Sequence, residues 1–455
     1  MWGELNRTNY QYQGCADPRW NKARNVIFCG EAYDAFYHDE EIHPLFEIPF
    51  ANQSMRVKQL GEIKHDRINA HDSRFVHSLA SAACTTGSLV YLVNKGASEL
   101  VPWWDAIIAH ALFHDIGHGP YSHSTEYLLK LVTGVDHKER GIQLLDKPLY
   151  DNRTLSEHLA YHDIDSTLVK ELMSGKHPAS KIVADKTLGA EKIAYIERDV
   201  EKCFYPVQPP SLDSILHKLL YRDGVLGLEG TDTCEMRRLV ENPDIHLLAS
   251  ELQRVYVMLY ADLYLSPASL LLARHVQRAT QVLLNAGIDG NTIWTWDDRE
   301  FESYARRSGG VAEHEMALLE QEELTPPKIV WRLSGESRIS RFSTERVEHV
   351  GRDEARAIGK VLSDPRRIAK VEDGISAMIG GQAYLTACPA PERFDPHPVN
   401  FFGSKEQYTL GDVVHDHSQT LSGIADRHWA IRLHTRAAVS NDFSKEVIRY
   451  LLEFK

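Results

Sequence analysis

The sequence predicts a mainly α fold, in which a large helical core precedes a smaller C-terminal α+β region. Three observations support this prediction. Apolar residues recur with helical spacing through most of residues 52–290. Gly287 and Gly290 then close the last long helical pattern, as glycines commonly do. Beyond residue 291, shorter strand-like pieces alternate with helical ones.

The first helical segments flank a short glycine-containing turn. Residues 75–93 are small and apolar with helical spacing, which predicts a packed core helix. A second helix is expected to begin near Pro102, and residues 103–114 continue it as a nearly wholly apolar, and therefore buried, helix. Glycines and a proline at 117–120 break this helix, so the next one is expected over residues 122–132.

The rest of the chain follows the same two patterns. Further helices are expected over residues 153–174, 188–203, 210–222, 244–286, 344–362 and 444–453. Strands are expected over residues 328–333 and 430–436. These patterns divide the chain into an N-terminal arm (1–40), a helical domain (41–290) and a C-terminal α+β region (291–455).

The composition is that of an ordinary globular chain with an acidic balance. Of 455 residues, 43% are hydrophobic and 25% are charged, which excludes disordered, collagen-like and disulfide-scaffold classes. The net charge of −13 argues against nucleic acid as the main partner, because coating phosphates needs excess cations. A small anionic substrate remains compatible with this charge if the cations gather in one pocket.

Cysteine usage and the absence of targeting signals predict a cytoplasmic protein. The cysteines are scattered without a CxxC pair, at Cys15, Cys29, Cys84, Cys203, Cys234 and Cys388. This spacing fits a reducing compartment better than a zinc ribbon or a disulfide framework. The N-terminal residues show no secretory signal, and no stretch reaches 18 uninterrupted apolar residues, so no membrane span is expected.

Histidine is the residue type in excess, with 23 copies, and it is the commonest metal ligand and acid–base residue. The dipeptide His-Asp occurs six times, but one copy differs in its context: HDIGHGPYSH, from His114 to His123, follows the buried helix. A buried carboxylate beside a buried imidazole is costly unless it is paired or metal-bound. The alternative is that His110 and His114, one helical turn apart, simply pack inside a helical core.

The motif HDIGHGPYSH resembles the signature of the HD-domain phosphohydrolases, and specifically of the deoxynucleoside triphosphate (dNTP) triphosphohydrolases. Within that family it is most similar to the group that carries SAM and HD domains, although no separate SAM domain is expected here. Further similar blocks follow the family's order: EIHPLF (41–46), MRVKQLG (55–61), SRFVHSL (73–79), VDHKERG (135–141), EKIAYIERD (191–199), HPVNFF (397–402) and AIRLHTRAAV (430–439). The resemblance therefore covers most of residues 41–455 and implies an HD-domain helical core.

The resemblance implies a metal centre formed by His77, His114, Asp115 and Glu191. The family usually has Asp at the fourth position, and Glu191 keeps the carboxylate one methylene longer. We expect Glu191 to ligate the metal, directly or through a water, with weaker metal binding as the alternative. Mixed imidazole and carboxylate ligands suit a divalent transition metal such as Fe, Mn or Zn, and Mg is expected with the nucleotide triphosphate.

The same resemblance implies roles in catalysis and substrate binding. Three residues are expected to be catalytic, namely His123, Arg74 and His118, with His123 as the general acid or base near the scissile phosphate. The phosphates are expected to contact Arg74, His118, His137 and Lys192. The deoxyribose is expected to contact Gln59, Tyr195 and Asp199. Any one of these residues could instead have a purely structural role, in an ion pair, as a helix cap or in the core. The functional interpretation rests on their occurring together in the family's order.

The implied reaction is hydrolysis of a dNTP to the deoxynucleoside and inorganic triphosphate by a metal-activated water. Relatives assemble into oligomers and respond to nucleotides, so a homo-oligomer and an activating or inhibiting nucleotide are expected. Asn52 and Gln53 replace the residues that read a guanine activator in the family. Nucleotide activation is therefore expected to use another base, another site or none.

Alternative functions remain open from the sequence. One is another HD-domain enzyme, a phosphodiesterase or a nucleotidase. Another is a nucleotide-sensing regulatory subunit with a weakened metal site, which Glu191 in place of Asp would favour. Binding or cleavage of single-stranded nucleic acid is a third. The biological role is open as well, between control of dNTP pools and antiviral dNTP depletion.

Overall fold

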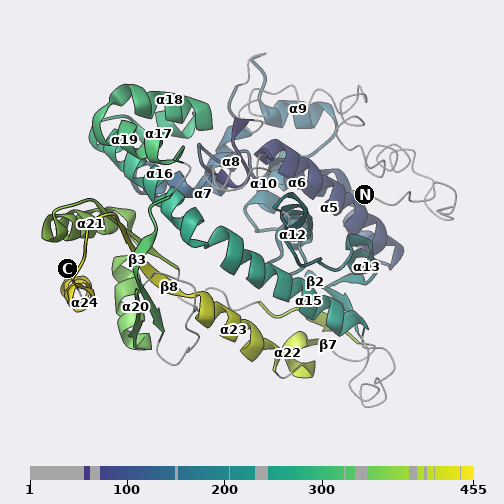
Figure 1. Cartoon of the computed structure of the whole chain (residues 1–455). Helices are drawn as coiled ribbons and strands as arrows, with labels where there is room; N and C mark the ends of the chain where they lie inside the picture. Colours follow the sequence, from purple (N-terminus) through teal and green to yellow (C-terminus); the bar gives the residue numbers. More distant parts are fainter. Residues whose placement is uncertain are drawn as a thin grey trace.

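The computed structural model describes residues 56–61, 72–148, 152–203, 205–230, 244–321, 324–333, 346–388, 397–403, 407–414, 416–440 and 442–454. Within these residues the protein is mainly helical, as predicted, with two small four-stranded sheets (Figure 1). The expected N-terminal arm, the EIHPLF block, and Asn52 and Gln53 lie outside the described residues.

The helical core comes first along the chain. Its elements are α5 (Arg74–Asn94), η2 (Ser98–Trp103), α6 (Trp104–Phe113), α7 (His123–Thr133), α8 (His137–Leu144), α9 (Leu155–Tyr161), α10 (Ser166–Met173), α11 (Ser180–Ala184), α12 (Ala190–Lys202), α13 (Leu212–Leu216), β1 (Leu219–Arg222), β2 (Val225–Glu229), α15 (Asp244–Leu259), the π-helical turn η4 (Tyr260–Tyr264) and α16 (Pro267–Asn285).

The C-terminal part contains shorter helices and most of the strands. Its elements are α17 (Gly290–Trp294), α18 (Asp298–Ser308), α19 (Gly310–Leu318), β3 (Pro327–Leu333), β4 (Arg346–Val350), α20 (Arg352–Val361), α21 (Pro365–Ile379), β5 (Ala383–Ala387), β6 (Asn400–Phe402), β7 (Gln407–Thr409), α22 (Leu410–Val413), α23 (His417–His428), β8 (Ala430–Thr435) and α24 (Phe443–Glu453).

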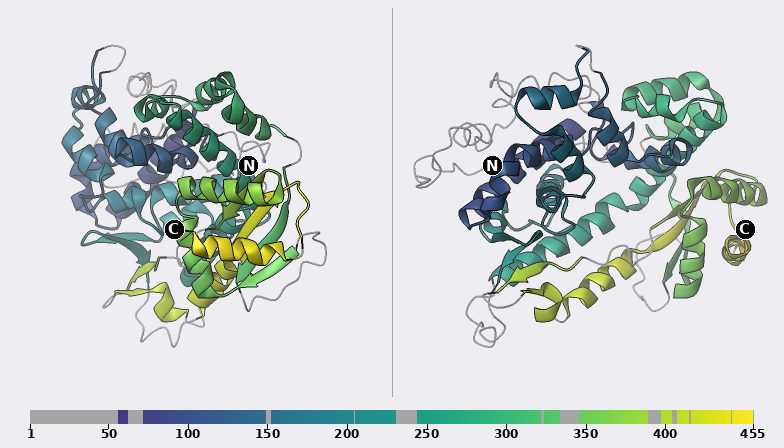
Figure 2. Two further views of the ribbon diagram at one scale, coloured as in Figure 1. Left: turned by 90° about the vertical axis from the view of Figure 1, so that its left-hand side faces the viewer. Right: turned by 180° about the vertical axis from the view of Figure 1, so that it is seen from behind.

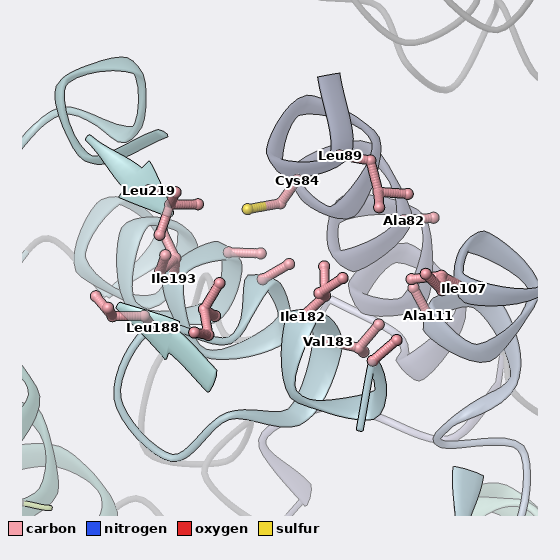
Figure 3. Close-up of a cluster of buried hydrophobic side chains, with 14 of the residues drawn as sticks. Ala82, Cys84, Leu89, Ile107, Ala111, Ile182, Val183, Leu188, Ile193 and Leu219 are labelled. Carbon is pink, nitrogen blue, oxygen red and sulfur yellow. The ribbon is translucent and has the colours of Figure 1, made fainter. Parts of the chain in front are cut away.

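Helix α5 is a central core helix of the first part (Figure 3). Ser73 caps it by accepting a hydrogen bond from the amide of Val76 at 3.3 Å. Its apolar side chains share one buried cluster with Ile107 of α6, Ile182 of α11 and Ile193 of α12. By length and composition α5 could cross a membrane, but 67% of its apolar window is buried inside the protein. The α15–η4 segment and α16 pass the same test only as a pair bent by 58°.

Strands of the C-terminal part divide between the two sheets. The first sheet has the order β1-β2-β6-β7, in which β6 pairs parallel with β2, so a late segment completes a sheet of the helical core. The second sheet has the order β4-β3-β8-β5 and shares a separate apolar cluster with α20, α21 and α24 (Figure 2). After forming β3, β4 and β5 of the second sheet, the chain adds β6 and β7 to the first sheet and then returns to the second sheet with β8.

Several expected helices differ from the observed ones. The helix expected over 210–222 is wrong for most of its length, because only α13 is helical and β1 pairs with β2 as a hairpin. Asp223 and Gly224 form its two-residue turn with φ of 49° and 76°, the backbone that Asp-Gly favours. The helix expected over 344–362 begins as strand β4, which pairs parallel with β3, and only α20 is helical. Turns also divide the expected helix over 153–174 into α9 and α10.

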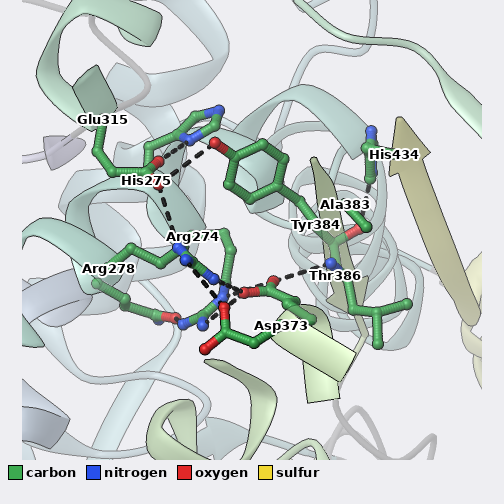
Figure 4. Close-up of polar contacts among 12 residues, drawn as sticks. Arg274, His275, Arg278, Glu315, Asp373, Ala383, Tyr384, Thr386 and His434 are labelled. Atoms are coloured by element: carbon green, nitrogen blue, oxygen red, sulfur yellow. Dashed lines mark hydrogen bonds and ion pairs between the residues drawn. The ribbon is translucent and has the colours of Figure 1, made fainter. Parts of the chain in front are cut away.

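A buried network of charges joins α16 to the second sheet (Figure 4). Arg274 of α16 donates to both oxygens of Glu372 of α21, at 2.8 and 2.9 Å, and both side chains are at most 2% exposed. Arg278 donates to the same carboxylate at 2.7 Å and contacts Glu315 of α19 at 3.1 Å. The amide of Leu385 in β5 donates to Glu372 at 2.9 Å. Because α16 also packs against α7, this network supports the helix that leads out of the HD motif.

Candidate active site

The HD motif forms the turn between α6 and α7. Helix α6 ends at Phe113, so His114 and Asp115 stand at its C-terminal end. Gly117 packs against the start of α8, where a Cβ atom would lie 1.8 Å from the carbonyl oxygen of His137. Glycine is therefore required at this position, and its close contact brings His137 beside the motif.

Three of the four predicted metal-ligating side chains, those of His77, His114 and Glu191, meet at this turn, and Asp115 lies beside the two imidazoles. His114 Nε2 lies 3.2 Å from His77 Nε2 and 3.8 Å from Glu191 Oε1. Asp115 lies 3.4 Å from His114 Nε2 through Oδ1 and 3.6 Å from His77 Nε2 through Oδ2. The ligand atoms of His77, His114 and Glu191 all lie within 4.8 Å of one another. Helices α5 and α12 and the end of α6 thus bring together residues that are far apart in the sequence.

The donor set fits a transition-metal ion. His114 Nδ1 donates to the carbonyl oxygen of Ala111 at 2.8 Å, which leaves the Nε2 lone pair facing the cluster. Burial lowers the pKa of His77 well below its ordinary value, so its imidazole is neutral and able to ligate. Two imidazoles with nearby carboxylates are ligands that Fe, Mn and Zn accept.

Arg74 lies in a buried ion pair beside this cluster. Its Nη1 is 2.5 Å from Asp115 Oδ2, and its Nε donates to Ser122 Oγ at 3.0 Å. Burial alone would raise the pKa of Asp115, but His114 and Arg74 hold it well below its ordinary value. Arg74 lines the cavity described below, as its predicted phosphate contact requires. It also orients the carboxylate of Asp115 and the turn at Ser122.

Three imidazoles form a second cluster next to the first. His118 stacks on His137 with ring centroids 4.1 Å apart, and His123 meets these rings edge-on at 4.7 and 5.5 Å. Glu126 of α7 lies 2.8 Å from His123 Nδ1 and 2.5 Å from His137 Nδ1. The buried His118 has no hydrogen-bond partner for Nδ1 among the described residues, while its Nε2 lies 3.5 Å from Asp115 Oδ1. Since buried polar groups are usually paired, His118 is well placed to bind a ligand.

Both clusters border one cavity of about 630 Å³. Small-molecule sites typically enclose about 300–1,000 Å³, so a nucleotide-sized ligand fits this volume. Gln59, Tyr195 and Asp199, which were predicted to hold a sugar, line the same cavity. His110 and Lys138, for which no binding role was predicted, line it as well.

Lys192 is the predicted phosphate contact that the structure does not bring to the cavity. Its ammonium donates to the carbonyl oxygen of Lys186 at 2.7 Å and lies 3.2 Å from the centroid of the Tyr256 ring. Burial lowers the pKa of Lys192 to about 7. Among the described residues that line the cavity, Lys192 is absent. Its side chain instead packs on α15.

Asp199 provides a test of the cavity's electrostatics. Burial raises its pKa to about 7, against the opposing effect of Tyr264, whose hydroxyl donates to Asp199 Oδ2. In the unfolded chain an aspartate has a pKa near 3.9. The protonated carboxyl therefore stabilises the folded state fully below about pH 4, and this contribution is lost as pH rises through 7.

We expect Asp199→Asn, which mimics the neutral carboxyl, to become more stable relative to the unmodified protein as pH rises from 5 to 8. The difference in unfolding free energy should grow by on the order of 1 kcal/mol or more. Urea unfolding of both proteins at the two pH values measures it. An equal difference at both pH values would show that Asp199 is already ionised at pH 5.

Sequence reasoning missed Glu126 and Tyr264. Glu126 lies three residues after His123, and this helical spacing between an acid and an imidazole is the signal that could have identified it. Tyr264 lies in η4, 65 residues after its partner Asp199, and no local pattern links the two.

Comparisons with known proteins give partial sequence matches. No protein-family model matches the chain. The chain is 33% identical over 152 residues to the uncharacterized protein YwfO of Bacillus subtilis, and 27% identical over 186 residues to a deoxynucleoside triphosphate triphosphohydrolase of Danio rerio. These matches cover 32% and 38% of this chain, and 32% and 29% of the relatives. The chain thus spans about a third of the length of the curated relatives it matches.

Two solved structures resemble the protein over most of its length. A phosphohydrolase from Bacteroides thetaiotaomicron has a TM-score of 0.58 at 16% identity, covering 87% of this chain and 95% of that one. A hypothetical protein from Aquifex aeolicus has a TM-score of 0.59 at 14% identity, covering 91% and 96%. At these identities the likeness shows the fold. Together with the HD motif and its cluster of metal-ligating side chains, it supports placing the chain in the HD-domain phosphohydrolase superfamily, with a mainly α fold.

Proposed function

We propose that the protein is a metal-dependent phosphohydrolase that converts a dNTP to the deoxynucleoside and inorganic triphosphate. The observation that carries this proposal is the shared cavity. Its lining includes metal-ligating side chains, three imidazoles with Arg74, and three polar side chains predicted to hold a sugar, namely His114, Asp115, Glu191, His118, His123, His137, Arg74, Gln59, Tyr195 and Asp199. These are the parts needed to bind a cation, a phosphate chain and a sugar in one place. The partial similarity to a triphosphohydrolase adds support.

The metal would be held by His77, His114, Glu191 and Asp115. A divalent ion bound there supplies a water of lowered pKa and stabilises charge that develops at the phosphorus. Asp115 stays ionised through its contact with Arg74, so the site provides negative charge to balance the cation.

The imidazole cluster would bind the phosphates and move a proton. The unpartnered Nδ1 of His118 can contact a phosphate oxygen. His123 directs Nδ1 to Glu126, so its Nε2 is the atom that would carry a proton to the departing 5′ oxygen of the deoxynucleoside. His123 has a side chain that is 67% exposed, which leaves its ring accessible to a substrate.

Hydrolysis of a nucleotide with fewer phosphates is a second candidate, favoured by the position of Lys192. Without Lys192 at the cavity, the described lining residues provide Arg74 and Lys138 as cationic side chains. A single phosphate needs fewer cationic contacts than a triphosphate does.

The test is turnover by the pure protein with all four dNTPs, singly and mixed, in Mg and Mn, with the products separated by chromatography. Deoxynucleoside plus intact triphosphate is the expected result, and activity that needs a mixture would show nucleotide activation. Hydrolysis of a deoxynucleoside monophosphate without attack on dNTPs would favour the second candidate. Absence of product from a metal-loaded protein would contradict both.

Glu126 should matter for this activity without ligating the metal at His77, His114 and Glu191, although it lies with His118, His123 and His137 in a second group whose ligand atoms are within 4.8 Å of one another. We expect Glu126→Gln to lower kcat by on the order of 10²-fold, because the variant loses the carboxylate that orients His123 and His137. Metal bound at the His77, His114 and Glu191 centre, measured by mass spectrometry of the elements, should stay unchanged, because Glu126 is not one of its ligands. Glu139→Gln on the exposed side of α8 is the control and should retain kcat. A variant at Glu126 with normal kcat would remove the proton-transfer role from this cluster.

A further inference from the structure

The turn that leads into His123 has an unusual backbone. Tyr121 and Ser122 have φ values of 56° and 52°, in the left-handed region that residues with a side chain rarely adopt. Such conformations persist where the surrounding contacts determine them, and they gather at functional sites. Ser122 is the last residue before α7, so this turn sets the direction in which His123 enters the cavity.

One carboxylate from a distant part of the chain holds this turn. Asp298 Oδ1 accepts a hydrogen bond from the amide of Tyr121 at 2.8 Å, and its Oδ2 accepts one from the amide of Lys58 at 3.2 Å. Asp298 is 1% exposed and is the first residue of α18, where the helix N-terminus favours a negative charge. It therefore joins the turn to the 56–61 segment, 177 and 240 residues away in sequence.

The contact extends to the residues of the site. Ser122 Oγ donates to the carbonyl oxygen of Lys58 at 3.0 Å and accepts from Arg74 Nε at 3.0 Å. Lys58 precedes Gln59, which lines the cavity. The Asp298 carboxylate is thus hydrogen-bonded to both backbone segments that carry Gln59 and His123, and Arg74 is connected to both through Ser122.

We propose that Asp298 is a positioning residue, which fixes the relative placement of Gln59 and His123 across the cavity. This role rests on the proposed function, because it takes these two side chains as the ones that face the sugar and the scissile phosphate. Asp298 touches no substrate atom in this scheme. It acts through the backbone of Tyr121 and Lys58.

The experiment compares Asp298→Ala, Asp298→Asn and Glu300→Ala. Asp298→Ala loses both hydrogen bonds, and Asp298→Asn keeps an acceptor for one of them. Glu300→Ala is the matched control, because Glu300 accepts the amide of Asp297 at 2.8 Å in the same first turn of α18 and does not contact the HD turn. It weakens the same helix without touching the site.

We expect Asp298→Ala to lower kcat/KM for the dNTP by on the order of 10²-fold, the effect of a reacting group misplaced by about 1 Å. Asp298→Asn should fall between Asp298→Ala and the unmodified protein, and Glu300→Ala should change kcat/KM by less than about threefold, since it leaves the reacting groups in place. All three should retain the metal, because none of its ligands belongs to the Tyr121–Ser122 segment. Equal losses in Asp298→Ala and Glu300→Ala would overturn the proposal.

A crystal structure of the variant provides a readout that does not depend on activity. We expect Tyr121 and Ser122 to leave the left-handed region in Asp298→Ala. Retention of both φ values and of the position of Lys58 would overturn the proposal even if activity fell. If the unmodified protein hydrolyses no dNTP, the proposed function fails. The backbone conformation of Tyr121 and Ser122 in the variant then still shows whether Asp298 positions this turn. Asp298→Asn serves the same purpose if Asp298→Ala does not fold.

Discussion

Replacing His114 with asparagine should remove both the metal and the activity. His114 directs its Nε2 at His77 and Glu191 and is oriented by the carbonyl oxygen of Ala111, so the variant loses a central donor of the cluster. Loss of one ligand should weaken metal binding by at least about 10²-fold. Because the metal accounts for several kcal/mol of transition-state stabilisation, kcat/KM should fall by at least about 10³-fold. Elemental analysis after Mn loading and the dNTP assay measure the two effects.

His110→Asn is the matched control for metal content. His110 lies one turn earlier on α6 and is buried, but it is not part of the cluster of His77, His114 and Glu191. Its variant should bind the metal with the stoichiometry of the unmodified protein. Metal retained by His114→Asn, or lost equally from both variants, would contradict the proposed centre.

Glu372→Ala should produce the largest loss of stability among the residues discussed. Glu372 is fully buried and binds Arg274, Arg278 and the amide of Leu385, and these contacts keep its pKa low although burial alone would raise it. Removal of one partner leaves a buried guanidinium uncompensated, which typically costs about 3–5 kcal/mol. Urea unfolding followed by circular dichroism measures this loss.

Asp373→Ala is the control at the next position of α21. Asp373 is 69% exposed and contacts Arg278 at 3.3 Å, so its loss should cost less than about 1 kcal/mol. Similar losses for the two variants would show that the buried network contributes little beyond a surface ion pair. Metal content should be normal in both, because the network lies outside the HD cluster.

The local patterns that predicted the helical core depend on short-range physics. The apolar spacing that predicts a helix over 75–93 corresponds to α5 (Arg74–Asn94), and the glycines of the motif end α6 as expected. Such features need only neighbouring residues, because helical periodicity and chain breaks are local properties. The same reasoning failed at residues 210–222 and 344–362, where pairing with a distant or adjacent strand outweighed helical propensity.

For the candidate site, the sequence alone determined the motif and the residue types that a metal and a phosphate require, and it predicted the mainly α fold around them. Only the tertiary structure decided which of these residues meet. It brought His77 and Glu191 to His114, linked Glu126 to two imidazoles, and directed Lys192 toward Tyr256. It also placed Asp298 of α18 against the turn before His123. The physical reason is that helix packing and backbone hydrogen bonds between distant segments set these contacts, and no local pattern encodes them.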